Sequence, residues 1–110
     1  IMIVDHLKTP YYAVIFTTIM TDNLENYSET AQKMESLAKL QKGFLGIESA
    51  RSELGITVSY WQTLDDISRW KNNIEHTEVR NLGREKWYQQ YQLRICKVER
   101  EYGFEKKKQF

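Results

Sequence analysis

The segment YYAVIFTTIM, residues 11–20, decides the fold of this chain. It is rich in β-branched and aromatic residues, which favour a β-strand. Side chains alternate between two faces along a strand, and here both faces are largely apolar. An antiparallel strand with one solvated face would instead alternate apolar and polar residues. We therefore expect a strand that is covered on both sides.

A helix and a hairpin are predicted after this strand. Asp22 is followed three residues later by Glu25, a capping-box pattern that predicts a helix start, and Gly43 suits the left-handed end of that helix. Phe44 to Ser52 and Ile56 to Thr63 flank a short connection that contains glycine. This arrangement is typical of a β-hairpin.

A second helical region and a final strand complete the pattern. Thr63 or Asp65 caps the helix, and Asn72-Asn73 predicts a break in it, with helix resuming around Thr77. Tyr91 to Glu101 predicts the last strand.

The element order is therefore βαββαβ. It predicts an α+β fold of the ferredoxin-like type, with two helices on one face of a four-stranded antiparallel sheet. Because the helices cover only one face, the apolar open face needs a lid. A second copy of the sheet is the simplest lid, so we expect a homodimer.

Size and composition indicate one ordinary globular domain. The chain has 110 residues, is 41% hydrophobic, and carries 16 Lys and Arg against 15 Asp and Glu. We divide it into an N-terminal arm (1–10), a domain (11–102) and a C-terminal tail (103–110). The single Cys96 excludes an internal disulfide, and the polar start of the chain does not fit a signal peptide. A cytoplasmic protein is expected.

Several classes of partner are disfavoured. The near-neutral charge argues against nucleic-acid binding, and the longest apolar run, Tyr11 to Phe16, is too short to span a membrane. Lys42 to Ile47 superficially resembles the RNA-binding motif of RRM domains, but it opens the second strand rather than the third, so RNA binding is kept only as an alternative. His6, His76 and Cys96 match no metal-site spacing. No metal or nucleotide cofactor is expected.

The second half of the chain carries a family resemblance. Its residues, in order, are Tyr60-Trp61, Leu64-Asp65-Asp66, Trp70, His76, Arg80, Gly83, Trp87-Tyr88-x-x-Tyr91 and Val98-Glu99-Arg100. This pattern resembles the small bacterial members of the antibiotic-biosynthesis-monooxygenase family, and residues 43–49 resemble that family's central hairpin. The resemblance covers about Tyr11 to Tyr102. It implies a dimeric α+β barrel and oxidation of planar aromatic molecules by oxygen without metal or flavin.

The resemblance suggests roles for six residues. Such a reaction needs a base, donors for an oxyanion and an apolar pocket. His76 is the candidate base, Arg80 or Asn72 the candidate donors, and the ring walls would come from Trp61, Trp70 and Trp87. We therefore expect an enzyme that oxidises a small aromatic or quinol-like substrate.

Structural roles compete with each of these functional ones. Trp70 lies at helical spacing from Ile67 and Ile74 and suits a packing role, while Trp87 suits an interface anchor. His76 at a helix break could simply bond a free carbonyl group, and Arg80 could be a solvated charge. A domain that binds a hydrophobic ligand without turnover is therefore an alternative.

Haem binding or degradation is the other alternative. Some members of the wider fold family use an Asn on the first strand, a Trp and a helical His for this purpose. Trp70 matches the Trp, but the expected ligand position holds Arg80, His76 lies a turn too early, and the first strand has no Asn.

Overall fold

The computed structural model describes residues 2–107 and has the expected element order, with the second helical region divided in two. The elements are β1 (Tyr11–Met20), α1 (Tyr27–Lys39), β2 (Phe44–Arg51), β3 (Gly55–Trp61), α2 (Leu64–Lys71), α3 (Ile74–Leu82), the π-helical turn η1 (Gly83–Trp87) and β4 (Tyr88–Val98). Residues 1 and 108–110, at the outer ends of the predicted arm and tail, lie outside the described residues.

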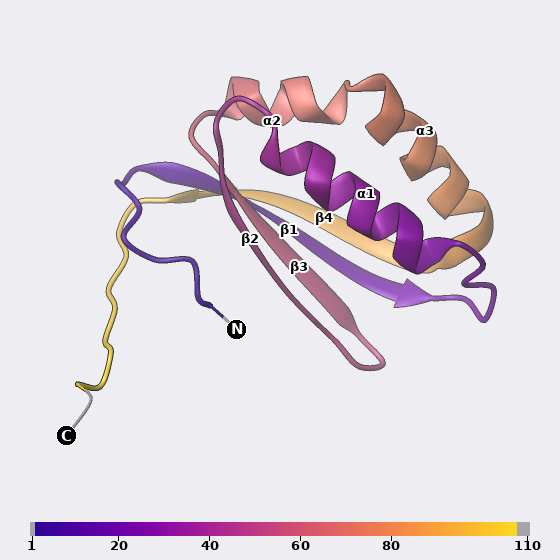
Figure 1. The fold of residues 1–110 in the computed structure, drawn as a ribbon, viewed down its shortest axis with the longest axis horizontal. Coiled ribbons are helices and arrows are strands. Elements are labelled where there is room, and N and C mark those ends of the chain that lie inside the picture. The colour runs from indigo at the N-terminus through magenta and orange to yellow at the C-terminus, as the bar shows by residue number, and fades with distance from the viewer. Residues whose placement is uncertain (1, 108–110) are drawn as a thin grey trace.

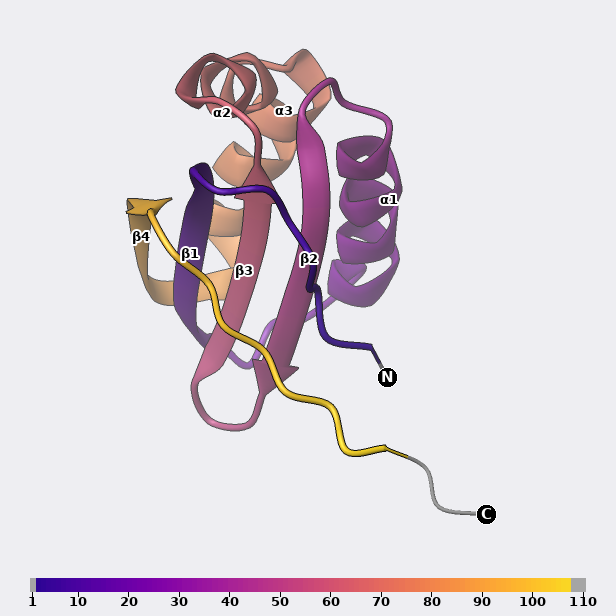
Figure 2. The same ribbon diagram turned by 90° about the vertical axis from the view of Figure 1, so that its left-hand side faces the viewer.

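All four strands form one antiparallel sheet in the order β2-β3-β1-β4. The helices lie together on one side of it (Figure 1), and Figure 2 shows α1 beside β2. The α+β, ferredoxin-like fold is thereby confirmed. The strand β1 lies inside the sheet, as its apolar sequence requires.

Strand pairing assigns each side chain to a face, because directly opposed residues of antiparallel strands point the same way. Trp61 lies opposite Tyr12, whereas Tyr60 lies opposite Ala13. Trp61 stacks on Trp70 of α2, so the Trp61 face is the one beneath the helices. Tyr60 therefore belongs to the open face. The sequence alone did not show which of Tyr60 and Trp61 faces the helices.

The bounds of several elements differ from the prediction. Strand β2 ends at Arg51 instead of Ser52, and β3 runs from Gly55 to Trp61 instead of from Ile56 to Thr63. Helix α1 begins at Tyr27 behind Asn26, which has a left-handed φ of 63° and no side-chain cap, so the Asp22 capping box is wrong. Helix α3 begins at Ile74, three residues before the predicted restart at Thr77. The π-helical turn ends at Trp87, so β4 starts three residues early, at Tyr88, and ends at Val98.

The junction between α1 and α2 depends on Gly43. Its φ of 83° is left-handed, as expected for the stop of a helix, and a Cβ there would overlap the carboxylate of Asp66. Asp66 is 4% exposed and accepts hydrogen bonds from Thr63 Oγ1 (2.8 Å) and Arg69 Nη1 (2.7 Å). Burial alone would raise the pKa of the Asp66 carboxyl, but these bonds lower it.

The arm and tail leave the sheet on its open side (Figure 1). The backbone N–H of Val4 donates to Glu48 Oε2 (2.9 Å), and Tyr60 Oη donates to Glu48 Oε1 (2.6 Å). Tyr11 Oη donates to Glu101 Oε1 (2.8 Å), just before the tail. These bonds hold both segments at one end of the open face. Among residues 2–107 no helix has the length and apolar character needed to cross a membrane.

Candidate functional site

Three of the predicted residues form a stack between the sheet and α3. The rings of Trp70 and His76 are nearly parallel, with centroids 4.5 Å apart and an angle of 10° between them. On its other side Trp70 stacks with Trp61 at 6.3 Å, and the indole N–H of Trp61 donates to Ser59 Oγ (2.9 Å). Because Trp61 is only 1% exposed, this stack fixes the plane of the His76 ring from within the core.

Hydrogen bonding defines the tautomer of His76. Its Nδ1 lies 3.1 Å from the backbone carbonyl oxygen of Trp70. A carbonyl oxygen can only accept, so Nδ1 carries the proton and Nε2 keeps a lone pair. No hydrogen bond among the described residues involves Nε2. The ring therefore presents a free basic nitrogen, although its Nδ1 makes the carbonyl contact expected of a structural histidine.

The environment of His76 favours its neutral form. Burial lowers the pKa of the imidazole below its usual value, and the positive charge of Arg80 lowers it further, against the hydrogen bond to Trp70, which raises it. A half-buried histidine with a depressed pKa is unprotonated at neutral pH and can accept a proton.

Arg80 lies one turn after His76 on α3 and is half-buried. Its Nε atom is buried and has no hydrogen-bond partner within the described part of the chain. A buried, unpartnered guanidinium N–H is costly, and in native proteins such a group requires an explanation.

The two asparagines at the helix break differ. Asn72 is exposed and ends α2, whereas Asn73 caps α3, its Oδ1 accepting from the backbone N–H of His76 (3.2 Å). The cap thus begins the helix at a defined turn and holds His76 in its first turn. The role of Asn72 as an oxyanion donor stays a prediction.

Trp87 lies in a different aromatic cluster. It is 1% exposed, donates through Nε1 to the backbone oxygen of Glu25 (2.9 Å) and packs edge-on against Tyr27 (5.4 Å). Tyr88 connects this pair to Phe16 beneath the helices. Trp61 and Trp87 contact protein in this conformation, so their predicted contact with substrate stays a prediction.

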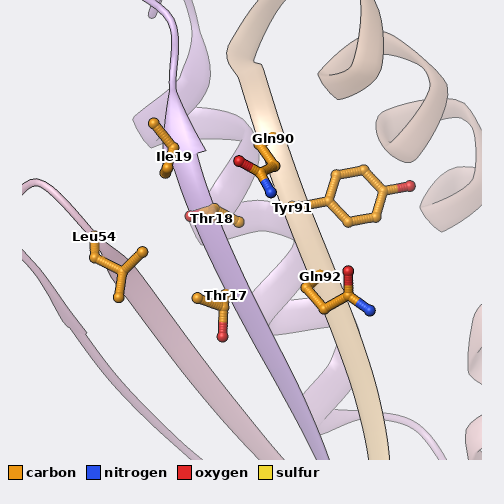
Figure 3. A pocket seen from close by; sticks show the side chains of 7 residues that line it. All are labelled: Thr17, Thr18, Ile19, Leu54, Gln90, Tyr91 and Gln92. Carbon is orange, nitrogen blue, oxygen red and sulfur yellow. The ribbon is translucent and has the colours of Figure 1, made fainter.

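Two hollows lie beside β4. The first, of about 80 Å³, is on the sheet between β1, β4 and the β2–β3 turn; Figure 3 shows Leu54 reaching from that turn toward Thr17 and Ile19. Its lining has no charged side chain. The second, of about 320 Å³, lies at the junction of η1 and β4 and includes Arg84, Tyr88 and Tyr91.

No role was predicted for Arg84, Tyr88 or Tyr91. Tyr88 and Tyr91 belong to the sequence pattern that resembles the monooxygenase family, and their rings lie 5.6 Å apart, with Tyr91 5.3 Å from Phe16. The only signal in the sequence was the density of aromatic residues around position 88. Arg84 had no signal, because its position depends on the π-helical turn.

Within the described residues no group of three His, Cys, Asp or Glu side chains could hold a metal ion. Haem needs one axial nitrogen, and His76 Nε2 is the nitrogen with a free lone pair. The position that the resemblance implies for the haem ligand, however, holds Arg80, and β1 has no Asn. These residues do not reproduce the haem-degrading set.

Comparison with known structures supports the fold. SnoaB, a cofactor-independent oxygenase from Streptomyces nogalater, superposes with a TM-score of 0.72 at 8% identity, covering 84% of this chain and 97% of that chain. Rv0793 from Mycobacterium tuberculosis superposes with a TM-score of 0.74 at 10% identity, covering 84% and 99%. At these identities the likeness shows the shared fold alone.

Sequence comparison gives the family. No protein-family model matches the chain. The chain is 46% identical over 100 residues to YqjZ, an uncharacterized protein of Bacillus subtilis (strain 168), and the match covers 89% of this chain and 88% of YqjZ. The chain therefore belongs to the same family as YqjZ.

Proposed function

We propose that this protein is a cofactor-independent monooxygenase of the antibiotic-biosynthesis-monooxygenase type, acting on a small aromatic, quinol-like or anthrone-like molecule. The proposal is supported by the state of His76, a neutral imidazole whose Nε2 is free and which feels the positive charge of Arg80, whose buried Nε has no partner among the described residues. The fold shared with the oxygenase SnoaB is consistent with it.

The reaction begins with a proton transfer. His76 Nε2 accepts a proton from the acidic position of the substrate, and Arg80 stabilises the oxyanion that forms. The electron-rich anion passes one electron to molecular oxygen, and the two radicals combine to form a carbon–oxygen bond. The peroxide anion so formed takes the proton back from His76 and becomes a hydroperoxide. For an anthrone, loss of water from the resulting hydroperoxide leaves a carbonyl group. One oxygen atom enters the product and the other leaves as water, so a CH2 group and O2 become C=O and H2O.

Oxygen consumption tests this proposal directly. Metal-free protein is given a panel of anthrones and reduced quinols, and uptake is compared with the rate of autoxidation. His76→Ala should lose most of the enzymatic uptake, whereas His6→Ala, which removes an exposed histidine in the arm, should keep it. Equal rates in the two variants would remove His76 from the mechanism.

Two outcomes would favour the alternatives. Binding of the aromatic compounds without uptake above autoxidation would indicate a ligand-binding domain. A Soret band that appears with micromolar haem and is lost in His76→Ala would indicate haem binding through Nε2.

We also propose that the protein acts as a homodimer joined through its open sheet faces. Ile19, which pairs with Gln90 of β4, is 38% exposed, and Ile56, which pairs with Thr17 of β1, is 41% exposed. Leu54 beside the Figure 3 hollow is 48% exposed. Burying such side chains against a second copy would stabilise the pair. Light scattering should give twice the chain mass for the protein and for Leu40→Asp, at an exposed helix end, and the single mass for Ile56→Asp.

A further inference from the structure

The larger hollow, at the end of the helical layer, has the dimensions of a ligand site. Its volume of about 320 Å³ is at the lower end for small-molecule pockets. It is lined by Arg84, Tyr88, Gln89, Gln90 and Tyr91. Aromatic rings and one cation therefore meet in the same space.

Arg84 is exposed and contacts Tyr91. Its Nε donates to Tyr91 Oη (2.7 Å), and its guanidinium carbon lies 5.8 Å from the centroid of the Tyr91 ring. Because Nε makes this bond, the two terminal nitrogens point away from it and can form the paired hydrogen bonds that a carboxylate accepts. Among residues 2–107 no carboxylate lies within ion-pair distance of Arg84.

The tyrosine on the other wall is also close to positive charge. Burial raises the pKa of Tyr88 and Tyr27 raises it further, whereas the cation of Arg51 lowers it. Gln89 and Gln90 are neutral. An anionic ligand would therefore meet the cation of Arg84 and the amide donors of the two glutamines, with no carboxylate among the lining residues to repel it.

The hollow lies on the helix that carries the candidate base. Leu82 and Gly83 have right-handed helical angles, so α3 runs directly into η1. Arg80 and Arg84 follow His76 at four and eight residues, which places Arg84 on the order of 12 Å along the axis from His76. A two- or three-ring planar molecule is of similar length.

We propose that this hollow binds the carboxylate of a planar aromatic acid, with the terminal nitrogens of Arg84 on the carboxylate and the ring against Tyr88 and Tyr91. This proposal rests on the proposed function in one respect: the ring so held is the one whose proton His76 removes. It narrows the substrate from aromatic molecules in general to aromatic carboxylic acids.

Calorimetry with two matched probes tests the proposal. 2-Naphthoate carries the carboxylate, and 2-naphthamide has nearly the same shape without the charge. The protein should bind 2-naphthoate more tightly than 2-naphthamide, and added salt should weaken only the charged probe. Arg84→Gln should weaken 2-naphthoate binding roughly ten- to one-hundredfold and change 2-naphthamide binding little.

Two further variants separate a direct role of Arg84 from a loss of fold. Arg100→Gln makes the same charge change at an exposed position before the tail and should bind 2-naphthoate as the unaltered protein does. Tyr91→Phe removes the hydroxyl that holds Arg84 and should give an intermediate loss. Equal binding of the two probes, or 2-naphthoate binding that is the same in Arg84→Gln and Arg100→Gln, would overturn the proposal. Tight binding of 2-naphthoate with no oxygen uptake on any substrate would instead defeat the proposed function and leave this site standing.

Discussion

The cap at Asn73 gives the sharpest test of how the fold positions His76. Asn73→Ala removes the Oδ1 acceptor of the His76 backbone N–H (3.2 Å). It keeps the backbone bond from Thr77 N to Asn73 O (2.9 Å), so the loss is confined to the side-chain cap. Such a loss costs about 1 kcal/mol, within a range of roughly 0.5–2 kcal/mol. For a domain of this size, about 1 kcal/mol corresponds to a fall in Tm of roughly 4–8 °C.

The neighbouring asparagine supplies the control. Asn72→Ala changes an exposed side chain that makes no hydrogen bond within the described residues, so its free energy of unfolding should stay within about 0.5 kcal/mol of the original. Asn73→Asp keeps a cap of equal quality and should restore most of the stability.

Urea unfolding followed by tryptophan fluorescence measures all three variants, and oxygen uptake is measured beside it. The uptake of Asn73→Ala should fall without being abolished, because His76 remains but its turn of helix frays. A loss of stability in Asn72→Ala as large as that in Asn73→Ala would refute the reasoning, as would an Asn73→Asp variant no better than Asn73→Ala.

Three further predictions follow from individual contacts. Because burial and Arg80 lower the pKa of His76, enzymatic uptake should rise with pH through a pKa below 6.5 and be level above it; a rise only above pH 7 would contradict the assigned base. Gly43→Ala should lower the free energy of unfolding, measured in urea, by roughly 2 kcal/mol or more, because φ is 83° and the added Cβ overlaps Asp66. Gly103→Ala is the control: no atom lies within 4 Å of its added Cβ, so its free energy of unfolding should not change. Burial and the bond to Glu101 raise the pKa of Tyr11 to about 12, so the contribution of this tyrosine to stability is complete below pH 10 and is lost as the pH rises to 12. The free energy of unfolding of Tyr11→Phe should therefore fall less steeply between pH 10 and 12 than that of the unaltered protein. Equal slopes for the two proteins would contradict the assignment.

The sheet was predictable because local chemistry determines it. The two-sided apolar pattern of Tyr11 to Met20 gave the bounds of β1 correctly, and Gly43 marked the left-handed stop after α1. The break at Asn72-Asn73 was also found, since two asparagines disfavour a helix interior. In each case the deciding interaction lies within a few residues of the sequence that predicts it.

The boundaries that were predicted wrongly depend on contacts between residues far apart in the sequence. Asp22 does not cap the helix, because it lies in a short loop that is held by two hydrogen bonds of Thr21. The Thr21 N–H donates to Trp87 O (2.7 Å), and Thr21 Oγ1 donates to Lys86 O (2.5 Å). These bonds join the end of β1 to the end of η1, more than sixty residues away. They occupy the chain just before Asp22, and α1 starts one turn later. No local pattern carries that information.

The candidate site divides in the same way. The sequence predicted that His76 and Arg80 lie together, because residues four apart share a helix face. The stack of Trp70 on His76 was not predictable, since it requires α2 to end at Lys71 and the chain to turn before α3. The position of Arg84 depends on further contacts. Gly83 lets the ring of Tyr88 approach the backbone, because an added Cβ there would overlap that ring. The π-helical turn that follows places Arg84 beside Tyr91. His76 and Arg80 lie on α3, and Arg84 beside the larger hollow follows in η1, farther from the start of the helix. A change in the helix cap at Asn73 should therefore disturb oxygen uptake more than ligand binding at Arg84.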